Sequence, residues 1–103
     1  MDTELRGMVD LLEAGQPDAD LGGGVYKMRL ARPGEGRSGG YRVIVFFKSE
    51  ERTFFIYSFA KSDRANISER QLRNFKKDAK TYLSRSDEQI RDLLRKRDLI
   101  EVQ

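Results

Sequence analysis

The chain has 103 residues, with 20 Lys or Arg against 17 Asp or Glu, and this length suits one domain, expected over residues 1–103, with one modest core. It contains no Cys and no His, which excludes disulfides, zinc-thiolate sites and the commonest general base, and we expect no metal or cofactor. No apolar run approaches the roughly 20 residues of a membrane helix, and the acidic N-terminus is unlike a secretory signal, so we expect a cytoplasmic protein.

The first predicted element is an amphipathic helix over residues 3–14. Its apolar side chains recur at the spacing of one helix face, and Gly15 follows as a stop signal. These apolar residues are Leu5, Met8, Val9 and Leu12. A loop is expected over residues 15–24.

Three runs downstream predict strands of one antiparallel sheet. In residues 25–30, alternation puts Lys27 and Arg29 on one face and the apolar side chains on the other. Residues 41–48 and 53–60 are rich in β-branched and aromatic side chains and are joined by a short polar link, which predicts a hairpin. Because both runs are apolar on both faces, we expect both to be central strands covered by helices.

Two capping-box patterns predict helix starts in the second half of the chain. Ser68 precedes Gln71, and Ser86 precedes Gln89, by the three residues that this motif requires. The helix from Ser68 has an apolar stripe and an opposite basic stripe. The apolar members are Leu72, Phe75, Ala79, Tyr82 and Leu83, and the basic members are Arg70, Arg73, Lys77 and Lys80. A short final strand is expected over residues 99–102, and the whole pattern indicates an α+β fold.

Positive charge is concentrated in residues 22–48, which carry six basic residues against one acidic residue, whereas residues 1–21 carry six acidic residues against one Arg. A local basic patch of this kind favours a polyanionic partner. The candidate site residues are Lys27, Arg29, Arg42 and Lys61, with Arg32 and Arg37 as mobile cations of a flexible, glycine-rich hairpin tip over residues 32–40. The alternative is that these are solvated surface charges.

Aromatic side chains interleave with these charges. Tyr26, Tyr41 and Tyr57 lie in or beside the charged strands, where a ring could stack on a nucleic-acid base. Core packing with a hydrogen-bonded hydroxyl is the alternative for each. The glycines at 34, 36 and 39 match G-x-G-x-x-G, but a strand and not a helix follows them, which argues against a dinucleotide site.

Three short segments, in this order and spacing, resemble the RelE/ParE superfamily of toxins from bacterial type II toxin-antitoxin modules, in particular its RelE and HigB-like branch. They are Y-K-M-R at 26–29, R-S-G-G-Y-R at 37–42 and F-A-K at 59–61. The resemblance implies a small twisted antiparallel sheet backed by helices. The first strand usual in that family is not evident before the helical region of this chain.

The same resemblance implies a function. Members of this branch are ribosome-dependent endoribonucleases, or mRNA interferases, which cut mRNA by attack of a 2′-hydroxyl on the adjacent 3′-phosphate and so inhibit translation. The implied catalytic residues are Lys27, Arg29, Arg42 and Lys61. Together with the cations and rings identified above, this predicts RNA binding by Arg32, Arg37, Tyr26 and Tyr41. The expected partners are a cognate antitoxin, the ribosome with its mRNA, and operator DNA reached through the antitoxin, with no membrane.

Two alternatives stay open. One is a non-catalytic, ParE-like toxin that binds DNA gyrase. The other is a non-toxic module that joins an antitoxin in autorepression at operator DNA. Clustered phosphate ligands favour the endoribonuclease, because a gyrase-binding toxin has no need of them.

Overall fold

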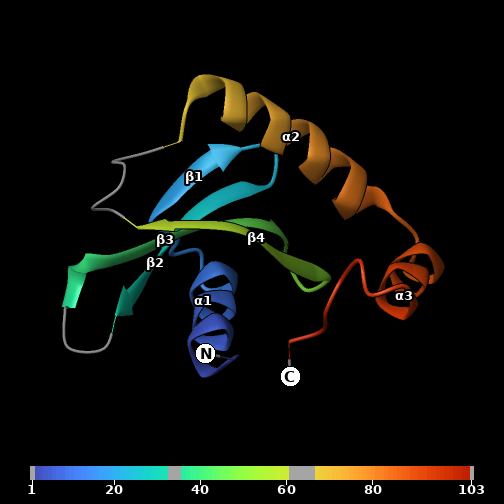
Figure 1. The fold of residues 1–103 in the computed structure, drawn as a ribbon, viewed down its shortest axis with the longest axis horizontal. Helices are drawn as coiled ribbons and strands as arrows, with labels where there is room; N and C mark the ends of the chain where they lie inside the picture. The colour runs from blue at the N-terminus through green and yellow to red at the C-terminus, as the bar shows by residue number, and fades with distance from the viewer. Residues whose placement is uncertain (1, 33–35, 61–66, 103) are drawn as a thin grey trace.

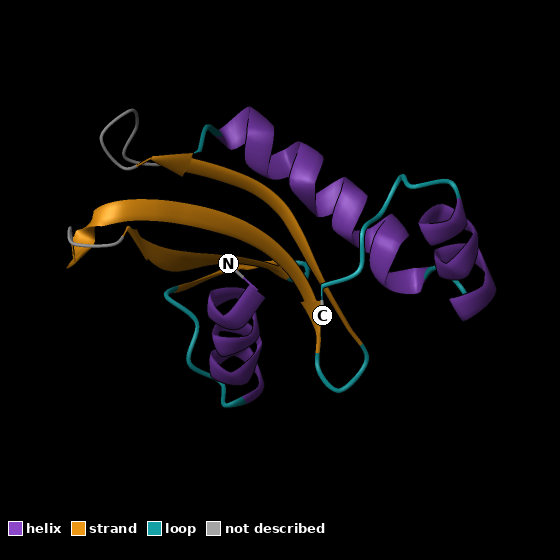
Figure 2. Ribbon diagram, turned by 60° about the horizontal axis from the view of Figure 1, so that its bottom comes forward, coloured by secondary structure: helices purple, strands orange, loops and turns teal. Residues whose placement is uncertain are grey.

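The computed structural model describes residues 2–32, 36–60 and 67–102. Three helices and four strands follow one another in the order α1 (Asp2–Glu13), β1 (Ala19–Gly22), β2 (Val25–Arg32), β3 (Gly36–Lys48), β4 (Arg52–Ala60), α2 (Glu69–Ser84) and α3 (Asp87–Arg95). The strands form one antiparallel sheet in the order β1-β2-β3-β4. Helices α1 and α2 lie on opposite faces of this sheet, and α3 lies beyond the end of α2 (Figures 1 and 2). The predicted α+β fold is therefore confirmed.

The sheet separates two hydrophobic clusters, one beneath each helix. Strand β3 supplies both clusters with alternate residues, because successive side chains of a strand point to opposite faces. The cluster on the α1 face consists of Met8, Leu12, Met28, Val43, Val45 and Phe47. The cluster on the α2 face consists of Val25, Ile44, Phe46, Phe59 and Ala79. No helix in the described part of the chain has the length and apolarity to cross a membrane.

The sequence missed β1, which lies inside the loop expected over residues 15–24. With four residues, of which Asp20 and Gly22 are poor strand formers, β1 carries no readable alternation. It forms because the turn after it folds it back onto β2. Gly22, Gly23 and Gly24 all have positive φ, between 65° and 89°, a conformation that glycine adopts without steric cost.

Three further expectations need correction. Strand β3 already starts at Gly36, so the predicted loop over 32–40 is mostly strand, and only residues 33–35 of it lie outside the described residues. Strand β4 is an edge strand of the described sheet and not a central one.

Residues 99–102 form no strand. The start of this segment closes the end of α3 instead, since Asp98 and Leu99 donate backbone hydrogen bonds to the Leu93 carbonyl at 3.0 and 3.3 Å.

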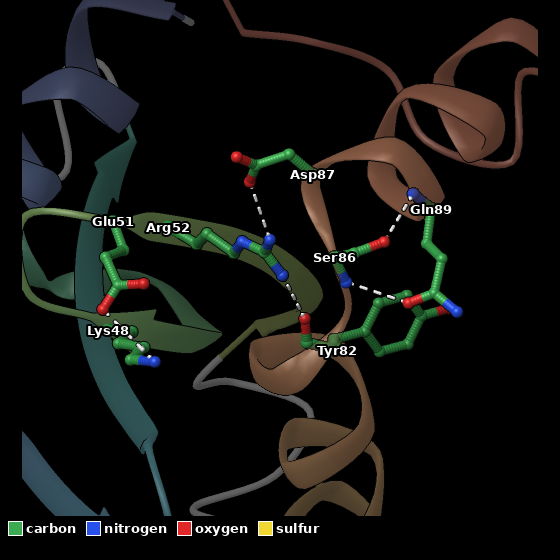
Figure 3. Close-up of polar contacts among 7 residues, drawn as sticks. All are labelled: Lys48, Glu51, Arg52, Tyr82, Ser86, Asp87 and Gln89. Atoms are coloured by element: carbon green, nitrogen blue, oxygen red, sulfur yellow. Dashed lines mark hydrogen bonds and ion pairs between the residues drawn. The ribbon is translucent and has the colours of Figure 1, made fainter.

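Both predicted capping boxes are present and position the C-terminal helices. The Ser68 hydroxyl accepts from the Gln71 N–H at 3.1 Å, and Ser86 does the same for Gln89 at 3.1 Å. In return, Gln89 accepts from the Ser86 N–H at 2.9 Å (Figure 3). Each box satisfies two N–H groups that a helix start would otherwise leave unpaired.

Arg52, at the start of β4, connects the sheet to both C-terminal helices. Its Nη1 donates to the Tyr82 carbonyl in the last turn of α2, and its Nη2 donates to Asp87 Oδ1 at the start of α3, both at 3.0 Å (Figure 3). The Arg52 side chain is largely buried in these contacts. It thereby links the end of α2 and the start of α3 to the edge strand of the described sheet.

Candidate functional site

The β2–β3 pairing brings three basic residues onto one face of the sheet. Arg29 lies directly opposite Arg42, and Lys27 lies opposite Ile44. Residues directly opposite each other in an antiparallel pair project from the same face. We call Lys27, Arg29 and Arg42 the cationic cluster. The expected hairpin and the shared face are confirmed, and the face is the one that α2 covers, since Ile44 belongs to the α2-side core.

Arg42 is buried, which contradicts the alternative of a solvated surface charge at this position. Only 8% of the residue is exposed, and its Nη1 atom is buried without a hydrogen-bond partner among the residues that the structure describes. The reason is its position in β3, a central strand, between Arg29 on β2 and the buried Phe59 on β4. Leaving a buried donor unsatisfied costs about 1 to 3 kcal/mol, more for a charged group. A bound anion would remove that cost.

Arg29 is the accessible member of the arginine pair. Its side chain is 46% exposed, and within the described residues Arg29 Nε lies 3.6 Å from Asp18 Oδ1. The same carboxylate accepts a hydrogen bond from the Arg29 backbone N–H at 2.6 Å through Oδ2. The sequence analysis did not identify Asp18, because its place beside Arg29 follows from the pairing of β1 with β2 and β1 was itself missed.

Two of the predicted RNA-binding tyrosines lie on the opposite face. Tyr26 is opposite Val45 and packs edge-on against Phe47, with ring centroids 5.8 Å apart, at the core beneath α1. Tyr41 is opposite Leu30 and is half-exposed on that same face. Neither ring therefore shares a face with the cationic cluster, and RNA binding by these two tyrosines stays a prediction.

Tyr57 is the tyrosine that shares the face of the cationic cluster. It lies opposite Ile44, and its ring centroid is 6.0 Å from those of Phe59 and Phe75. These contacts place it at the boundary between the α2-side core and the cluster. Its partly buried ring is held by neighbouring aromatic rings, as expected for core packing.

The remaining predicted site residues cannot be placed in the same way. Lys61 lies outside the described residues. Arg32 and Arg37 lie in β2 and β3 near the hairpin tip, where Arg32 pairs with Gly36, but their side chains are outside the described part of the structure. Their contributions to the site stay predictions.

An apolar groove lies elsewhere, between α1, the edge strand β4, α3 and the C-terminal segment. It has a volume of about 650 Å³ and is lined mainly by apolar side chains, including Leu5, Phe55, Ile90 and Ile100. No member of the cationic cluster lines it. Its chemistry is that of an apolar surface and not of a phosphate site, so we assign the candidate site to the cluster.

Comparison with known protein families gives one match over nearly the entire chain. The family is described as the RelE toxin of the RelE/RelB toxin-antitoxin system, and its model matches residues 1–102. No solved structure matches the chain significantly.

Proposed function

Since the chain belongs to the RelE toxin family and is thus a toxin with a cognate antitoxin, we propose that it acts as a ribosome-dependent endoribonuclease. In this proposal the protein cuts mRNA on the ribosome and so inhibits translation. The substrate is a polyanion, and the cationic cluster is the surface that binds it.

The observation that carries the proposal is the cross-strand pair of Arg29 and Arg42. Two guanidinium groups from directly opposite positions can converge on one phosphate, and each can donate two parallel hydrogen bonds to its oxygens. The buried, unpaired Nη1 of Arg42 adds a reason for an anion to bind there, since the described residues leave this donor unsatisfied.

The reaction forms a bond between the 2′-oxygen and phosphorus and breaks the bond between phosphorus and the 5′-oxygen, which leaves as a hydroxyl. In this reaction we assign Arg29 and Arg42 the role of stabilising the negative charge that develops on the phosphate oxygens. Preorganised donors aimed at such charge commonly provide the largest share of catalysis. With no His in the chain, Lys27 and Lys61 are the candidates for proton transfer. Alignment of the mRNA by the ribosome supplies the positioning.

The cognate antitoxin neutralises the toxin, and we propose that an acidic, amphipathic segment of it covers the cationic cluster. Opposite charge favours such a segment, and apolar residues of the α2-side core flank the cluster. If this is correct, the affinity of the complex falls as salt rises, and Arg29 becomes protected when the complex forms. A salt-insensitive complex that leaves Arg29 exposed would contradict this arrangement.

The test is a cell-free translation reaction with primer-extension mapping of the mRNA. We expect cuts at codons in the ribosomal A site with the unaltered protein and a loss of cutting by on the order of a hundredfold with Arg29→Ala. Arg70→Ala is the matched control, because it removes the same charge from an exposed position on α2.

Two other results would each support a different function. Inhibition of DNA supercoiling without mRNA cuts would indicate a gyrase-binding toxin. Neither effect, together with operator binding in the presence of antitoxin, would indicate an autorepression module. Cutting by Arg29→Ala at the rate of the unaltered protein would reject the site assignment while leaving the nuclease activity in place.

A further inference from the structure

Asp18 supplies a negative charge at the edge of the cationic cluster. It lies just before β1, which pairs with β2, and its side chain is 22% exposed. Its Oδ2 accepts the Arg29 backbone N–H at 2.6 Å, and its Oδ1 faces Arg29 Nε at 3.6 Å. The carboxylate is therefore fixed to the backbone of β2, beside the guanidinium that we assign to phosphate binding.

Such a carboxylate has two opposing effects on Arg29. It can orient the guanidinium group, which would favour binding of a phosphate, and it can repel that phosphate, which would oppose binding. The distance of 3.6 Å exceeds the usual range of about 2.7 to 3.2 Å for a hydrogen bond, so orientation is weak. The backbone hydrogen bond at 2.6 Å nevertheless holds the negative charge in place beside Arg29. Repulsion of the phosphate is the larger effect.

We infer that Asp18 is an internal counter-ion that lowers the affinity of Arg29 for RNA phosphate. This inference rests on the proposed function. It gives the toxin a means of selectivity: free RNA binds weakly because its phosphate must approach a fixed negative charge. An mRNA that the ribosome already holds in position loses less conformational entropy on binding, so it binds in spite of that repulsion.

The experiment measures binding of a fluorescein-labelled, single-stranded 2′-O-methyl RNA, which cannot be cut, by fluorescence anisotropy. Asp18→Asn removes the charge and keeps an oxygen that can accept the Arg29 N–H. Asp10→Asn is the control, because it makes the same change in net charge at an exposed position on α1, on the opposite face of the sheet. Asp18→Glu tests whether restoring the charge restores weak binding.

We expect Asp18→Asn to bind the RNA up to about fivefold more tightly than the unaltered protein at low salt, the range of an exposed charge interaction. The gain shrinks as salt rises, because partly exposed charges are screened. Asp10→Asn stays close to the unaltered protein, and Asp18→Glu returns towards it. In an Arg29→Ala background the gain from Asp18→Asn disappears, since the two side chains act as a coupled pair.

Equal affinity of Asp18→Asn and Asp10→Asn, including no measurable binding by either, would overturn the inference. So would a gain that persists in the Arg29→Ala background, because Asp18 would then act on some other group. These outcomes are separate from a failure of the proposed function, which would show as unaltered protein that makes no A-site cuts in the translation reaction. Asp18→Ala serves as a folding check, since it also removes the hydrogen bond at 2.6 Å and should lower thermal stability.

Discussion

Replacing Arg42 by Met should make the protein more stable and inactive. The Arg42 side chain is buried, and its Nη1 has no hydrogen-bond partner in the described parts of the chain. Replacing a buried, poorly compensated charge by an apolar side chain of similar volume is often neutral or stabilising by about 1 to 4 kcal/mol. Met follows the unbranched path of the arginine stem and adapts to irregular space, so the cavity left behind is small.

The expected gain in the free energy of unfolding is near the low end of that range, because Met is shorter than Arg and leaves some volume unfilled. A gain of about 1 kcal/mol raises the Tm of a domain of this size by roughly 4 to 8 °C. Loss of a transition-state phosphate contact should lower mRNA cleavage by on the order of a hundredfold or more. Thermal unfolding followed by circular dichroism and primer extension in cell-free translation measure the two effects.

Two further variants separate charge from packing. Arg29→Met changes a half-exposed arginine and should lower cleavage without raising Tm, since little desolvation is relieved there. Arg42→Lys keeps a charge but loses the planar fork, so it should lower cleavage without the gain in stability. A Tm of Arg42→Met several degrees below that of the unaltered protein would refute the reasoning, because the guanidinium would then have to be a satisfied structural group.

Three other substitutions test the elements that position the site. Gly24→Ala should strain the β1–β2 turn, because Gly24 has φ +84°, and it should displace the Leu83 side chain, whose Cδ1 would lie 2.6 Å from the added Cβ. The Tm should fall by several degrees, and an unchanged Tm would contradict this. Arg52→Leu should increase hydrogen exchange at the α2–α3 junction more than in the core of β3, because it removes both 3.0 Å hydrogen bonds to Tyr82 and Asp87. Hydrogen bonds from Lys96 and then Arg95 lower the pKa of Asp92. The stability that Asp92 contributes is therefore present above the ordinary carboxyl pKa and is lost as pH falls through the lowered pKa. Asp92→Asn should flatten the acid side of a plot of Tm against pH and leave the rest of the plot unchanged.

The elements that the sequence predicted well are those with local causes. A capping box requires only residues three apart, and the starts of α2 and α3 follow Ser68 and Ser86 as predicted. Alternation along β2 likewise predicted that Lys27 and Arg29 share a face. The same alternation already separated Tyr26 from Lys27, so its assignment to a common RNA surface conflicted with the strand pattern.

The features that the sequence did not predict depend on partners distant along the chain. Strand β1 has no pattern of its own and exists through pairing with β2. The edge position of β4 depends on whether another strand pairs with it, which apolar composition alone does not determine. Burial of Arg42 depends on what lies beside it in β2 and β4, and the contact of Asp18 with Arg29 spans 11 residues.

The two arginines of the cationic cluster differ in a way that fits a phosphate site built on a rigid strand. Arg29 lies in β2 beyond the residues that pair with β1, exposed and beside a counter-ion, whereas Arg42 lies in β3, whose residues 42–47 are all buried. A functional group on such a strand is held more precisely than one on a loop. The unpaired Arg42 donor lowers stability and forms no compensating hydrogen bond with the described residues. Unfavourable features of this kind concentrate at functional sites. Arg85 Nε is also buried without a hydrogen-bond partner among the described residues, but only Arg42 lies opposite a second arginine, and we therefore attribute its unpaired donor to the proposed phosphate site.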